Sequence, residues 1–332
     1  MMTETFQALV VEKAEASFSV TVKPLTFSDL PEGDVLIKVA YSSVNYKDGL
    51  ASIPDGKILR SYPFIPGIDL AGEVVSSTDS RYREGQQVIA SGYGIGVSHY
   101  GGYSEYARIP ADWITPLPAG LTPREAMIYG TAGFTAALSI QELEAHGMTP
   151  DKGKVLVTGA TGGVGGAAVA ILGARGYHVV ASTGKAAASE YLMSLGAAEV
   201  ISREDVTGET NKPLDKQLWQ AAVDSVGGNT LAAILSKIAY KGSVAASGLT
   251  AGTALTTTVL PFILRGVNLL GIDSVMCDLQ TRHKVWNRMA GDLKPDSLDR
   301  LVDREVTLQD VSGALAAILK SDTQGRVLVR IA

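Results

Sequence analysis

The stretch Lys154–Lys185, KVLVTGATGGVGGAAVAILGARGYHVVASTGK, decides how the rest of the chain is interpreted. It begins with a valine-rich apolar run over 154–158, which is typical of a buried parallel strand. A glycine-rich turn and a run of small residues suited to a helix follow, and a second apolar run covers 178–182. Strand, glycine turn, helix and strand in this order predict one βαβ unit.

The glycines of this turn predict the ligand of the unit. Gly162 lets the backbone approach a diphosphate, while Gly165 and Gly166 let the helix pack closely on the strand. The usual G-x-G-x-x-G pattern is present as Ala160-x-Gly162-x-x-Gly165, so its first glycine is replaced. The helix start presents N–H groups and a positive dipole end to the phosphates. We therefore predict a dinucleotide site, with a purely structural βαβ turn as the alternative.

The end of the second strand indicates which dinucleotide is bound. Sites for NAD usually carry Asp or Glu about 20 residues past the glycines, to bind the ribose 2′-hydroxyl. This chain has Ser182, Thr183, Gly184 and Lys185 at that point, and Arg203 follows the next predicted strand. Hydroxyls, a turn N–H and two cations suit a 2′-phosphate, which a carboxylate would repel. We predict NADP(H) as the cofactor; alternatively, Lys185 and Arg203 are solvated loop charges.

Length and composition restrict the class of protein. A chain of 332 residues with 46% apolar residues predicts two domains with sizeable cores. A formal net charge of −5 gives no electrostatic reason to expect nucleic acid or an anionic membrane as a partner. The single cysteine, Cys277, rules out an internal disulfide and fits a reducing compartment. The N-terminal residues lack the pattern of a signal peptide, and we expect a cytoplasmic protein.

The pattern of apolar residues divides the chain into three parts. Residues 1–126 read as a β-rich, largely antiparallel domain with short alternating strands. Residues 127–272 continue the βα alternation and predict six parallel strands with helical crossovers, a doubly wound sheet. Within this part we expect a helix that ends at 217–220, before a strand at 221–226. Residues 273–332 are predicted to form a helix-rich tail whose last strand, Arg326–Ile331, returns to the first domain.

Motifs spread over nearly the whole chain resemble those of the medium-chain dehydrogenase/reductases, in the zinc-free branch of quinone oxidoreductases and acrylyl-CoA reductases. The resemblance implies an α/β fold, with a Rossmann doubly wound parallel sheet and a β-rich, partly open barrel (GroES-like) as the catalytic domain. It also implies a homodimer. The motifs are Val44–Asp48, Pro66–Gly72, Gly130–Thr135, the glycine turn, Ala222–Gly227, Pro261–Gly266 and Gly271–Val275.

The chain differs from the zinc-dependent relatives at the positions where those enzymes bind the metal. Those enzymes hold catalytic zinc with a Cys where Asn45 stands and a His-Glu pair where Ile68 and Asp69 stand, and structural zinc with four cysteines. Tetrahedral zinc needs thiolate or imidazole ligands in number. One cysteine and histidines at 99, 146, 178 and 283 do not have ligand spacing. We therefore predict no metal site.

The resemblance also implies the site residues. Asn45, Tyr46 and Asp48 are the candidate catalytic residues: the Asn45 amide would bind the substrate oxygen or the nicotinamide ribose, and Tyr46 would contact the nicotinamide or donate a proton. Alternatively, Asn45 and Asp48 cap local backbone and Tyr46 packs its ring. Thr131 could be an N-cap, Leu249 and Ile263 could be core, and Arg326 could form a surface ion pair. The candidate cofactor-binding residues are Tyr46, Thr131, Thr161, Gly162, Gly163, Val164, Ser182, Thr183, Gly184, Lys185, Arg203, Leu249, Ile263, Ser274 and Arg326.

Hydride transfer without a Lewis acid suits a small-molecule substrate that is already electron-poor, a quinone or an α,β-unsaturated carbonyl such as acrylyl-CoA. We therefore predict an NADPH-dependent reductase; the alternative is an NADPH-binding regulatory or stress protein with little turnover. Tyr93, His99 and Tyr100 could wall a substrate site or close off their glycine-rich loop. Cations for a CoA thioester could come from Arg60, Arg265 and Arg282. The sequence does not choose between quinone and acrylyl-CoA.

Overall fold

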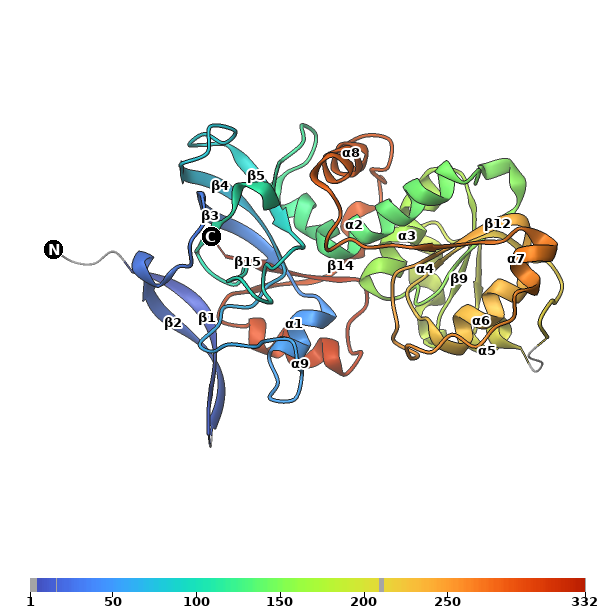
Figure 1. Ribbon diagram of the computed structural model, residues 1–332, viewed down its shortest axis with the longest axis horizontal. Coiled ribbons are helices and arrows are strands. Elements are labelled where there is room, and N and C mark those ends of the chain that lie inside the picture. Colours follow the sequence, from blue (N-terminus) through green and yellow to red (C-terminus); the bar gives the residue numbers. More distant parts are fainter. Residues whose placement is uncertain (1–4, 16, 209–211, 332) are drawn as a thin grey trace. The chain divides into compact units, whose positions relative to one another are not determined.

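The computed structural model describes residues 5–15, 17–208 and 212–331, and these form two compact units (Figure 1). Unit 1 consists of Met1–Thr131, Val275–Ala290 and Val302–Ala332. Unit 2 consists of Ala132–Ser274 and Gly291–Leu301. No described helix combines the length and the apolar character that crossing a bilayer requires.

The division between the units differs in detail from the one predicted. The first boundary lies after residue 131 rather than 126, close to Gly130, where helix α2 (Pro123–Ala145) is interrupted by non-helical backbone. The segment 273–332, predicted as one tail, is shared between the units, because 291–301 belongs to unit 2. Contacts of α3 (Gly163–Ala174) with the short helix η5 (Leu298–Leu301) account for this assignment.

Unit 2 is built on a six-stranded parallel sheet with the order β10-β9-β8-β11-β12-β13. The order reverses between β8 and β11, and ligands of doubly wound sheets bind outside the carboxyl ends of strands at such a point. The strands are β8 (Lys154–Val157), β9 (His178–Ser182), β10 (Glu199–Ile201), β11 (Trp219–Asp224), β12 (Ile238–Ala246) and β13 (Asn268–Gly271). The helices include α3, α4 (Ser189–Leu195), α5 (Arg203–Thr207), α6 (Gly228–Lys237) and α7 (Leu260–Arg265), with η3 (Pro150–Lys152) and η4 (Ala186–Ala188) (Figure 1).

The helix predicted to end at 217–220 is wrong. The crossover helix α5 ends at Thr207, and strand β11 already begins at Trp219. Trp219 is buried in the same apolar cluster as Leu156 and Ile234, so its burial extends the strand two residues before the predicted start. A large aromatic side chain on a fully buried strand outweighs the helical appearance of the polar residues before it.

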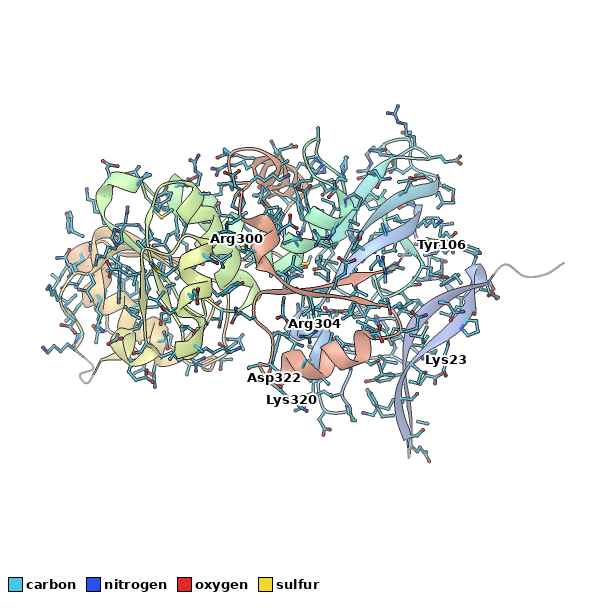
Figure 2. The ribbon with its side chains drawn as sticks, turned by 180° about the vertical axis from the view of Figure 1, so that it is seen from behind. Lys23, Tyr106, Arg300, Arg304, Lys320 and Asp322 are labelled. Carbon is cyan, nitrogen blue, oxygen red and sulfur yellow. The ribbon has the colours of Figure 1, made fainter. Side chains whose placement is uncertain are left out.

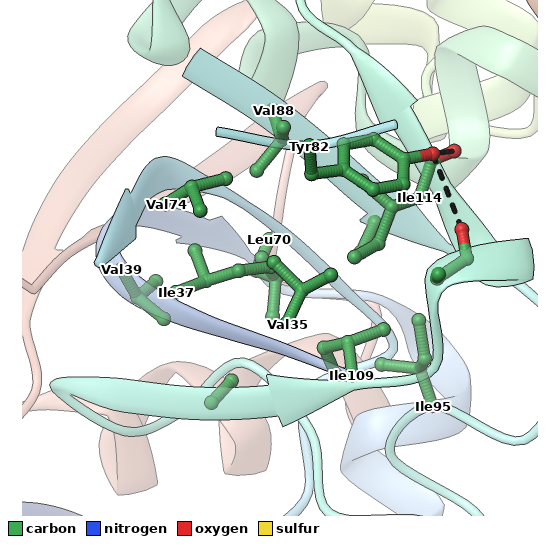
Figure 3. Close-up of a cluster of buried hydrophobic side chains, with 13 residues drawn as sticks. Val35, Ile37, Val39, Leu70, Val74, Tyr82, Val88, Ile95, Ile109 and Ile114 are labelled. Carbon is green, nitrogen blue, oxygen red and sulfur yellow. Dashed lines mark hydrogen bonds between the residues drawn. The ribbon is translucent and has the colours of Figure 1, made fainter. Parts of the chain in front are cut away.

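Unit 1 contains a seven-stranded sheet with the order β14-β15-β3-β4-β5-β7, in which β6 also pairs with β3. The strands are β3 (Val35–Ser43), β4 (Asp69–Ser77), β5 (Gln87–Ser91), β6 (Tyr106–Ile109), β7 (Ile114–Pro116), β14 (Val302–Thr307) and β15 (Arg326–Arg330). All the pairs are antiparallel except β14 with β15. Alternate residues such as Val35, Ile37 and Val39 point into one apolar cluster, which Figure 3 shows together with Tyr82. The Tyr82 hydroxyl lies 2.7 Å from the Ile114 carbonyl oxygen, which satisfies its buried polar group.

A separate antiparallel hairpin of β1 (Thr5–Ala14) and β2 (Ser17–Thr26) completes the strands of unit 1. Lys23 on β2 forms an ion pair with Glu12 on β1 across this hairpin (Figure 2). The helices of the unit are α1 (Tyr46–Ala51), the first part of α2, α8 (Leu279–Ala290) and α9 (Val311–Leu319), with η1 (Phe27–Asp29) and η2 (Ala111–Trp113). Helix α1 packs on α9, because Gly49 has no side chain to hold Ile318 and Leu319 away.

Candidate cofactor and active site

The glycine turn connects β8 to α3 over residues 158–162, at the carboxyl edge of the sheet in unit 2, and its motif continues into the first turn of α3. A Cβ atom on Gly165 would lie 2.3 Å from the Gly159 carbonyl oxygen, so only glycine allows this approach of helix to turn. Helix α3 begins at Gly163, and its N-cap is Gly162, which has no side chain to accept from the first helical N–H groups. These N–H groups and the helix dipole form the expected place for a diphosphate. The residues predicted to line the diphosphate lie at or just before this helix start: Thr161, Gly162, Gly163 and Val164.

Asp224 fixes the neighbouring strand end, a role that the motif analysis missed. Its Oδ1 accepts a hydrogen bond of 2.5 Å from the Thr158 hydroxyl, and its Oδ2 accepts one of 2.8 Å from the Gly227 N–H. Asp224 has no exposed surface, and burial raises its pKa, which the accepted hydrogen bonds oppose. The carboxyl ends of β8 and β11 are thereby tied together directly beneath the glycine turn. The motif Ala222–Gly227 contains Asp224, but the sequence does not show that Thr158 is its partner.

The residues predicted to select the dinucleotide lie at the ends of the neighbouring strands β9 and β10. The Thr183 hydroxyl accepts a hydrogen bond of 3.0 Å from the Lys185 N–H, which turns the chain at this point. A Cβ atom on Gly184 would lie 2.7 Å from the guanidinium carbon of Arg203, so the Arg203 side chain lies directly against this glycine. Ser182 and Thr183 are buried, whereas Gly184 and Arg203 are exposed. The structure therefore brings a guanidinium beside the turn that carries Lys185.

Three further candidate cofactor residues belong to unit 2. Leu249 is 62% exposed and Ile263 is 68% exposed, so neither is a core residue. The Ser274 hydroxyl lies 2.8 Å from the Thr135 hydroxyl, which fixes the segment after β13 to the second part of α2. No described contact assigns these three residues to a ligand, and their roles stay predictions.

In unit 1, Asn45 and Asp48 are buried at the start of α1. Asn45 is the N-cap residue, and Asp48 is the third residue of the helix. Oδ2 of Asp48 accepts a hydrogen bond of 3.0 Å from the Asn45 backbone N–H, and Oδ1 accepts one of 3.0 Å from the Ile68 N–H. Asp48 has no exposed surface and Asn45 is 7% exposed. The geometry thus matches the capping alternative for Asp48.

Asp69 connects this helix start to the rest of unit 1. Its Oδ2 accepts hydrogen bonds from the Asn45 side-chain amide over 2.9 Å and from the Thr131 N–H over 2.8 Å. Its Oδ1 accepts from the Ser43 hydroxyl over 2.7 Å. Thr131 follows the break in α2 at Gly130, so Asp69 caps the second part of that helix. Gly130 has φ +52°, and a Cβ atom there would lie 2.8 Å from Asp69 Oδ2.

Arg326 lies in the same buried cluster and is 3% exposed, so the predicted alternative of a surface ion pair is wrong. Its guanidinium donates hydrogen bonds to the carbonyl oxygens of Ile128 and Val44 and to the Ser43 hydroxyl, over 3.0, 3.3 and 2.6 Å. It also approaches Asn45 Oδ1 at 3.4 Å. Burial lowers the pKa of Arg326, and the nearby Asp69 opposes this effect. The guanidinium is thus directed at protein groups, and the Asn45 side chain is one of them.

The carboxyl group of Asp48 has a pKa that is raised toward neutrality. Burial first and the neighbouring Asp69 second raise the pKa of Asp48 to about 7, although the accepted hydrogen bonds lower it. Tyr103, whose hydroxyl donates to the Ser43 carbonyl oxygen over 3.1 Å, has a pKa raised well above its ordinary value by burial. Tyr46 differs from all of these, since it is 52% exposed. Of the three candidate catalytic residues, Tyr46 is the one with an exposed side chain.

The aromatic residues of the loop 92–103 have internal partners. The Tyr93 ring stacks on Trp113, and its hydroxyl donates to the Cys277 carbonyl oxygen over 3.0 Å. His99 Nε2 lies 2.7 Å from the Arg108 carbonyl oxygen, and Tyr100 packs edge-on against Phe64. These contacts match the second reading given above, in which the aromatic residues close off their own loop.

Two of the three arginines considered for a CoA thioester are used inside the fold. Arg282 is 1% exposed, and its guanidinium lies 4.8 Å from the centre of the Tyr93 ring. Arg265 donates hydrogen bonds of 2.8 and 3.3 Å to the carbonyl oxygens of Ser236 and Ile238. Arg60, by contrast, is exposed. Only Arg60 of this set therefore presents its charge to solvent.

Two protein-family models match the chain. The one described as "Alcohol dehydrogenase GroES-like domain" matches residues 31–119, and the one described as "Zinc-binding dehydrogenase" matches residues 163–291. The second description raises the question of zinc. Where zinc-dependent relatives have ligands, this chain has a side-chain amide, an isoleucine and Asp69, whose two oxygens both accept hydrogen bonds. This donor set does not fit tetrahedral zinc, and the described residues contain no group of three or more His, Cys, Asp or Glu that could hold a metal ion.

Relatives of known name match the chain over its whole length. "Putative quinone oxidoreductase YhfP" of Bacillus subtilis is 60% identical over 330 residues, which are 99% of this chain and 100% of that protein. Acrylyl-CoA reductase AcuI of Ruegeria pomeroyi is 50% identical over 328 residues, 98% and 99% of the two chains.

Two solved structures have the same fold at high identity. YhfP of Bacillus subtilis, crystallised with NAD, has a TM-score of 0.97 at 60% identity and covers 99% of this chain and 100% of its own. The yhdH oxidoreductase of Salmonella enterica, in complex with NADP, has a TM-score of 0.95 at 48% identity, over 98% of this chain and 100% of its own. The chain is therefore an oxidoreductase that belongs to the medium-chain dehydrogenase/reductase family, in the branch of the quinone oxidoreductases and acrylyl-CoA reductases.

Proposed function

We propose that this protein is an NADPH-dependent reductase that adds hydride to an electron-poor small molecule, a quinone or an α,β-unsaturated carbonyl compound of the acrylyl-CoA type. The reaction uses no metal step, because the residues at the ligand positions of the zinc-dependent relatives are joined to one another by hydrogen bonds. Substrates that already carry a strongly polarised double bond need no Lewis acid to accept hydride. They need a positioned donor and stabilisation of the developing oxyanion.

The contact of Arg203 with Gly184 is the main observation that favours NADPH over NADH. The guanidinium lies against the glycine that precedes Lys185, at the strand end where an NAD site would present a carboxylate. A guanidinium and an ammonium beside the Ser182 and Thr183 hydroxyls form a donor set for a phosphate monoester. A side chain at residue 184 would displace the guanidinium, so Gly184 is part of the same site.

The relatives support this proposal and also show why it needs a test. YhfP of Bacillus subtilis was crystallised with NAD, whereas the yhdH oxidoreductase of Salmonella enterica was crystallised with NADP. Both are close in sequence, so family membership alone does not choose between the two cofactors. The residues after β9 in this chain favour the phosphorylated form for the reason given above.

When bound, NADPH supplies the hydride. The N–H groups at the start of α3 bind the diphosphate, and the Gly159–Gly165 contact keeps that helix start in place. Thr161, Gly162, Gly163 and Val164 form this diphosphate site, while Ser182, Thr183, Lys185 and Arg203 bind the 2′-phosphate. Leu249, Ile263 and Ser274 provide the apolar and hydroxyl contacts for the nicotinamide end.

In unit 1 the roles of the candidate catalytic residues divide. Tyr46 is half-exposed, and we assign it to contact with the reacting molecules. Asn45 and Asp48 are positioning residues, because the buried hydrogen bonds to Asp69 and Ile68 hold the start of α1 on which Tyr46 stands. Thr131 and Arg326 join the same cluster through Asp69 and Ser43. The cluster thus fixes the backbone next to Tyr46.

The test is steady-state oxidation of NADPH followed by its absorbance, with acrylyl-CoA, 1,4-benzoquinone and buffer alone as the three arms. The proposal expects turnover with at least one substrate and a higher kcat/KM with NADPH than with NADH. Tight NADPH binding without turnover on any quinone, enal or enoyl thioester would instead indicate the regulatory alternative. A preference for NADH would refute the assignment of Lys185 and Arg203.

A further inference from the structure

A hollow of about 410 Å³ lies in unit 1 beside helix α1. It is bounded by that helix, by the loop 52–63 that follows it, and by the loop 92–103. The residues that line it are Lys47, Lys57, Ile58, Arg60, Val97 and Ser98. We call it the basic hollow. It begins one residue after Tyr46, the exposed candidate of the proposed active site.

The three cations of the basic hollow have no partner of opposite charge among the residues that the structure describes. Within the described part of the chain, the side chains of Lys47, Lys57 and Arg60 make no hydrogen bond and no ion pair, although many other basic side chains do. Asp55, the carboxylate of the same loop, does not line the hollow. Three like charges around one hollow repel each other unless an anion lies between them.

The backbone around these cations is fixed by short-range contacts. A Cβ atom on Gly56 would lie 1.7 Å from the Leu50 carbonyl oxygen, so the turn after α1 requires glycine there. Lys57 follows in the left-handed region with φ +56°, a conformation that is unfavourable for a residue with a side chain. Leu59 is buried in the cluster that contains Phe64, and Ile58 packs against the same cluster. Lys57 and Arg60 therefore project from an anchored loop.

The walls and the charges of the hollow indicate the class of ligand. Ile58 and Val97 offer apolar surface, and three donors of positive charge surround them. A small neutral quinone would satisfy none of these charges. A phosphate or diphosphate ester accepts from ammonium and guanidinium groups at once and carries the compensating charge.

We propose that the basic hollow is a binding subsite for the phosphate groups of the substrate, with Lys47, Lys57 and Arg60 as its specificity-determining residues. This inference rests on the proposed function, since it makes a phosphate-bearing enoyl thioester, rather than a neutral quinone, the substrate that the site favours. It assigns no chemical step to the hollow. Lys57 and Arg60 act by binding the part of the substrate that does not react, which lowers KM and leaves the hydride transfer unchanged.

The test measures binding to the NADPH-saturated protein by calorimetry, with coenzyme A, 3′-dephospho-coenzyme A and pantetheine as probes. Lys57→Gln and Arg60→Gln are compared with Lys38→Gln, an exposed lysine of unit 1 that does not line the hollow. We expect coenzyme A to bind the parent protein and each hollow variant to weaken it about tenfold, the size of one lost charge-assisted hydrogen bond. Lys38→Gln should leave the Kd unchanged, and pantetheine should bind weakly to all four proteins.

The two coenzyme forms distinguish which phosphate occupies the hollow. If 3′-dephospho-coenzyme A binds as tightly as coenzyme A, the diphosphate is the bound group; a loss of about tenfold identifies the 3′-phosphate. Equal affinity of all variants for coenzyme A, or no binding to the parent protein, would overturn the subsite.

Turnover separates this inference from the proposed function. With acrylyl-CoA, Lys57→Gln and Arg60→Gln should raise KM about tenfold with kcat unchanged, while kcat/KM for 1,4-benzoquinone stays as in the parent protein. Turnover of acrylyl-CoA that the variants do not alter would refute the subsite and leave the reductase intact. Binding of coenzyme A that the variants weaken, without any turnover, would refute the reductase and leave the subsite. Unchanged affinity for NADPH in each variant shows that the protein is folded.

Discussion

The side-chain amide nitrogen of Asn45 lies 2.9 Å from Oδ2 of Asp69 and donates a hydrogen bond to it. The resemblance described above implies that both residues stand at zinc-ligand positions of the metal-dependent relatives, and in this chain a direct hydrogen bond joins the two side chains. The same Oδ2 atom accepts from the Thr131 N–H, and Oδ1 accepts from Ser43. Asp69 therefore joins the starts of α1 and of the second part of α2 to the strand β3.

This arrangement predicts that Asp69→Asn destabilises unit 1 strongly. Every described partner of the Asp69 side chain is a donor, and the amide NH₂ of Asn would face at least one of them inside a buried cluster. We expect a loss of about 2–4 kcal/mol in the free energy of unfolding, measured with urea. Asp55→Asn, an exposed carboxylate in the same unit, is the control and should change stability by less than about 0.5 kcal/mol. Equal effects of both substitutions would contradict the role of Asp69.

The raised pKa of Asp48 predicts that the free energy of unfolding depends on pH. Its pKa is raised from 3.8 to about 7, so the folded protein holds a proton that the unfolded chain releases. The stability that this proton contributes is fully present below about pH 4 and is lost as the pH rises to about 7, because ionised Asp48 remains buried. The full difference corresponds to about 4 kcal/mol.

Asp48→Asn removes this titration. The variant loses an acceptor for the Ile68 N–H or the Asn45 N–H, so it is less stable than the parent protein at pH 5. The difference in unfolding free energy between the two proteins should then shrink as the pH rises from 5 to 8. Urea unfolding at four pH values measures this difference, and a constant or growing difference would show that Asp48 does not titrate in this range.

The sequence predicted unit 2 well because its signals are local. The strand, glycine turn, helix and strand of the βαβ unit depend on residues that are neighbours in the chain, and the structure contains them in this order. The wrong element, the helix end at 217–220, lies where the preference of Trp219 for a buried strand depends on contacts with β8 and α6. Such contacts come from distant parts of the sequence.

The buried cluster of unit 1 was only partly predictable for the same reason. Asp48 as a helix cap followed from its spacing to Asn45, but its contact with Ile68 did not. Arg326 reaches Ser43 across 283 positions of sequence, because strand β15 pairs with β3. No periodicity connects two residues at that distance. The basic hollow was invisible for a similar reason, since Lys47 and Val97 approach one another only in the folded unit.

Gly165 provides a test of the diphosphate site that does not depend on charge. A Cβ atom there would lie 2.3 Å from the Gly159 carbonyl oxygen and 2.7 Å from the Ala160 Cα atom, and both are backbone atoms that cannot turn away. Gly165→Ala should therefore shift the start of α3 and weaken NADPH binding at least 100-fold, measured by fluorescence titration. Gly271→Ala in β13 is the matched control, since no atom lies within 4 Å of its Cβ position. The site assignment fails if the two variants bind NADPH equally well.

Lys185 tests the choice between the two nicotinamide cofactors. Lys185→Asp places a carboxylate beside the turn against which Arg203 lies, where it would repel a 2′-phosphate and could bind a ribose 2′-hydroxyl. We expect NADPH to bind about 10- to 100-fold more weakly, the size of one or two lost charge-assisted hydrogen bonds, and NADH to change by less than about threefold. Lys152→Asp makes the same change of charge in η3, which precedes β8 and so lies at the opposite edge of the parallel sheet. It should leave both Kd values unchanged. The control has the same net charge as the test variant, so an equal loss of NADPH affinity in both would indicate long-range electrostatics. An equal loss of NADPH and NADH affinity in Lys185→Asp would indicate a distorted turn. Either result would refute a specific contact of Lys185 with the 2′-phosphate.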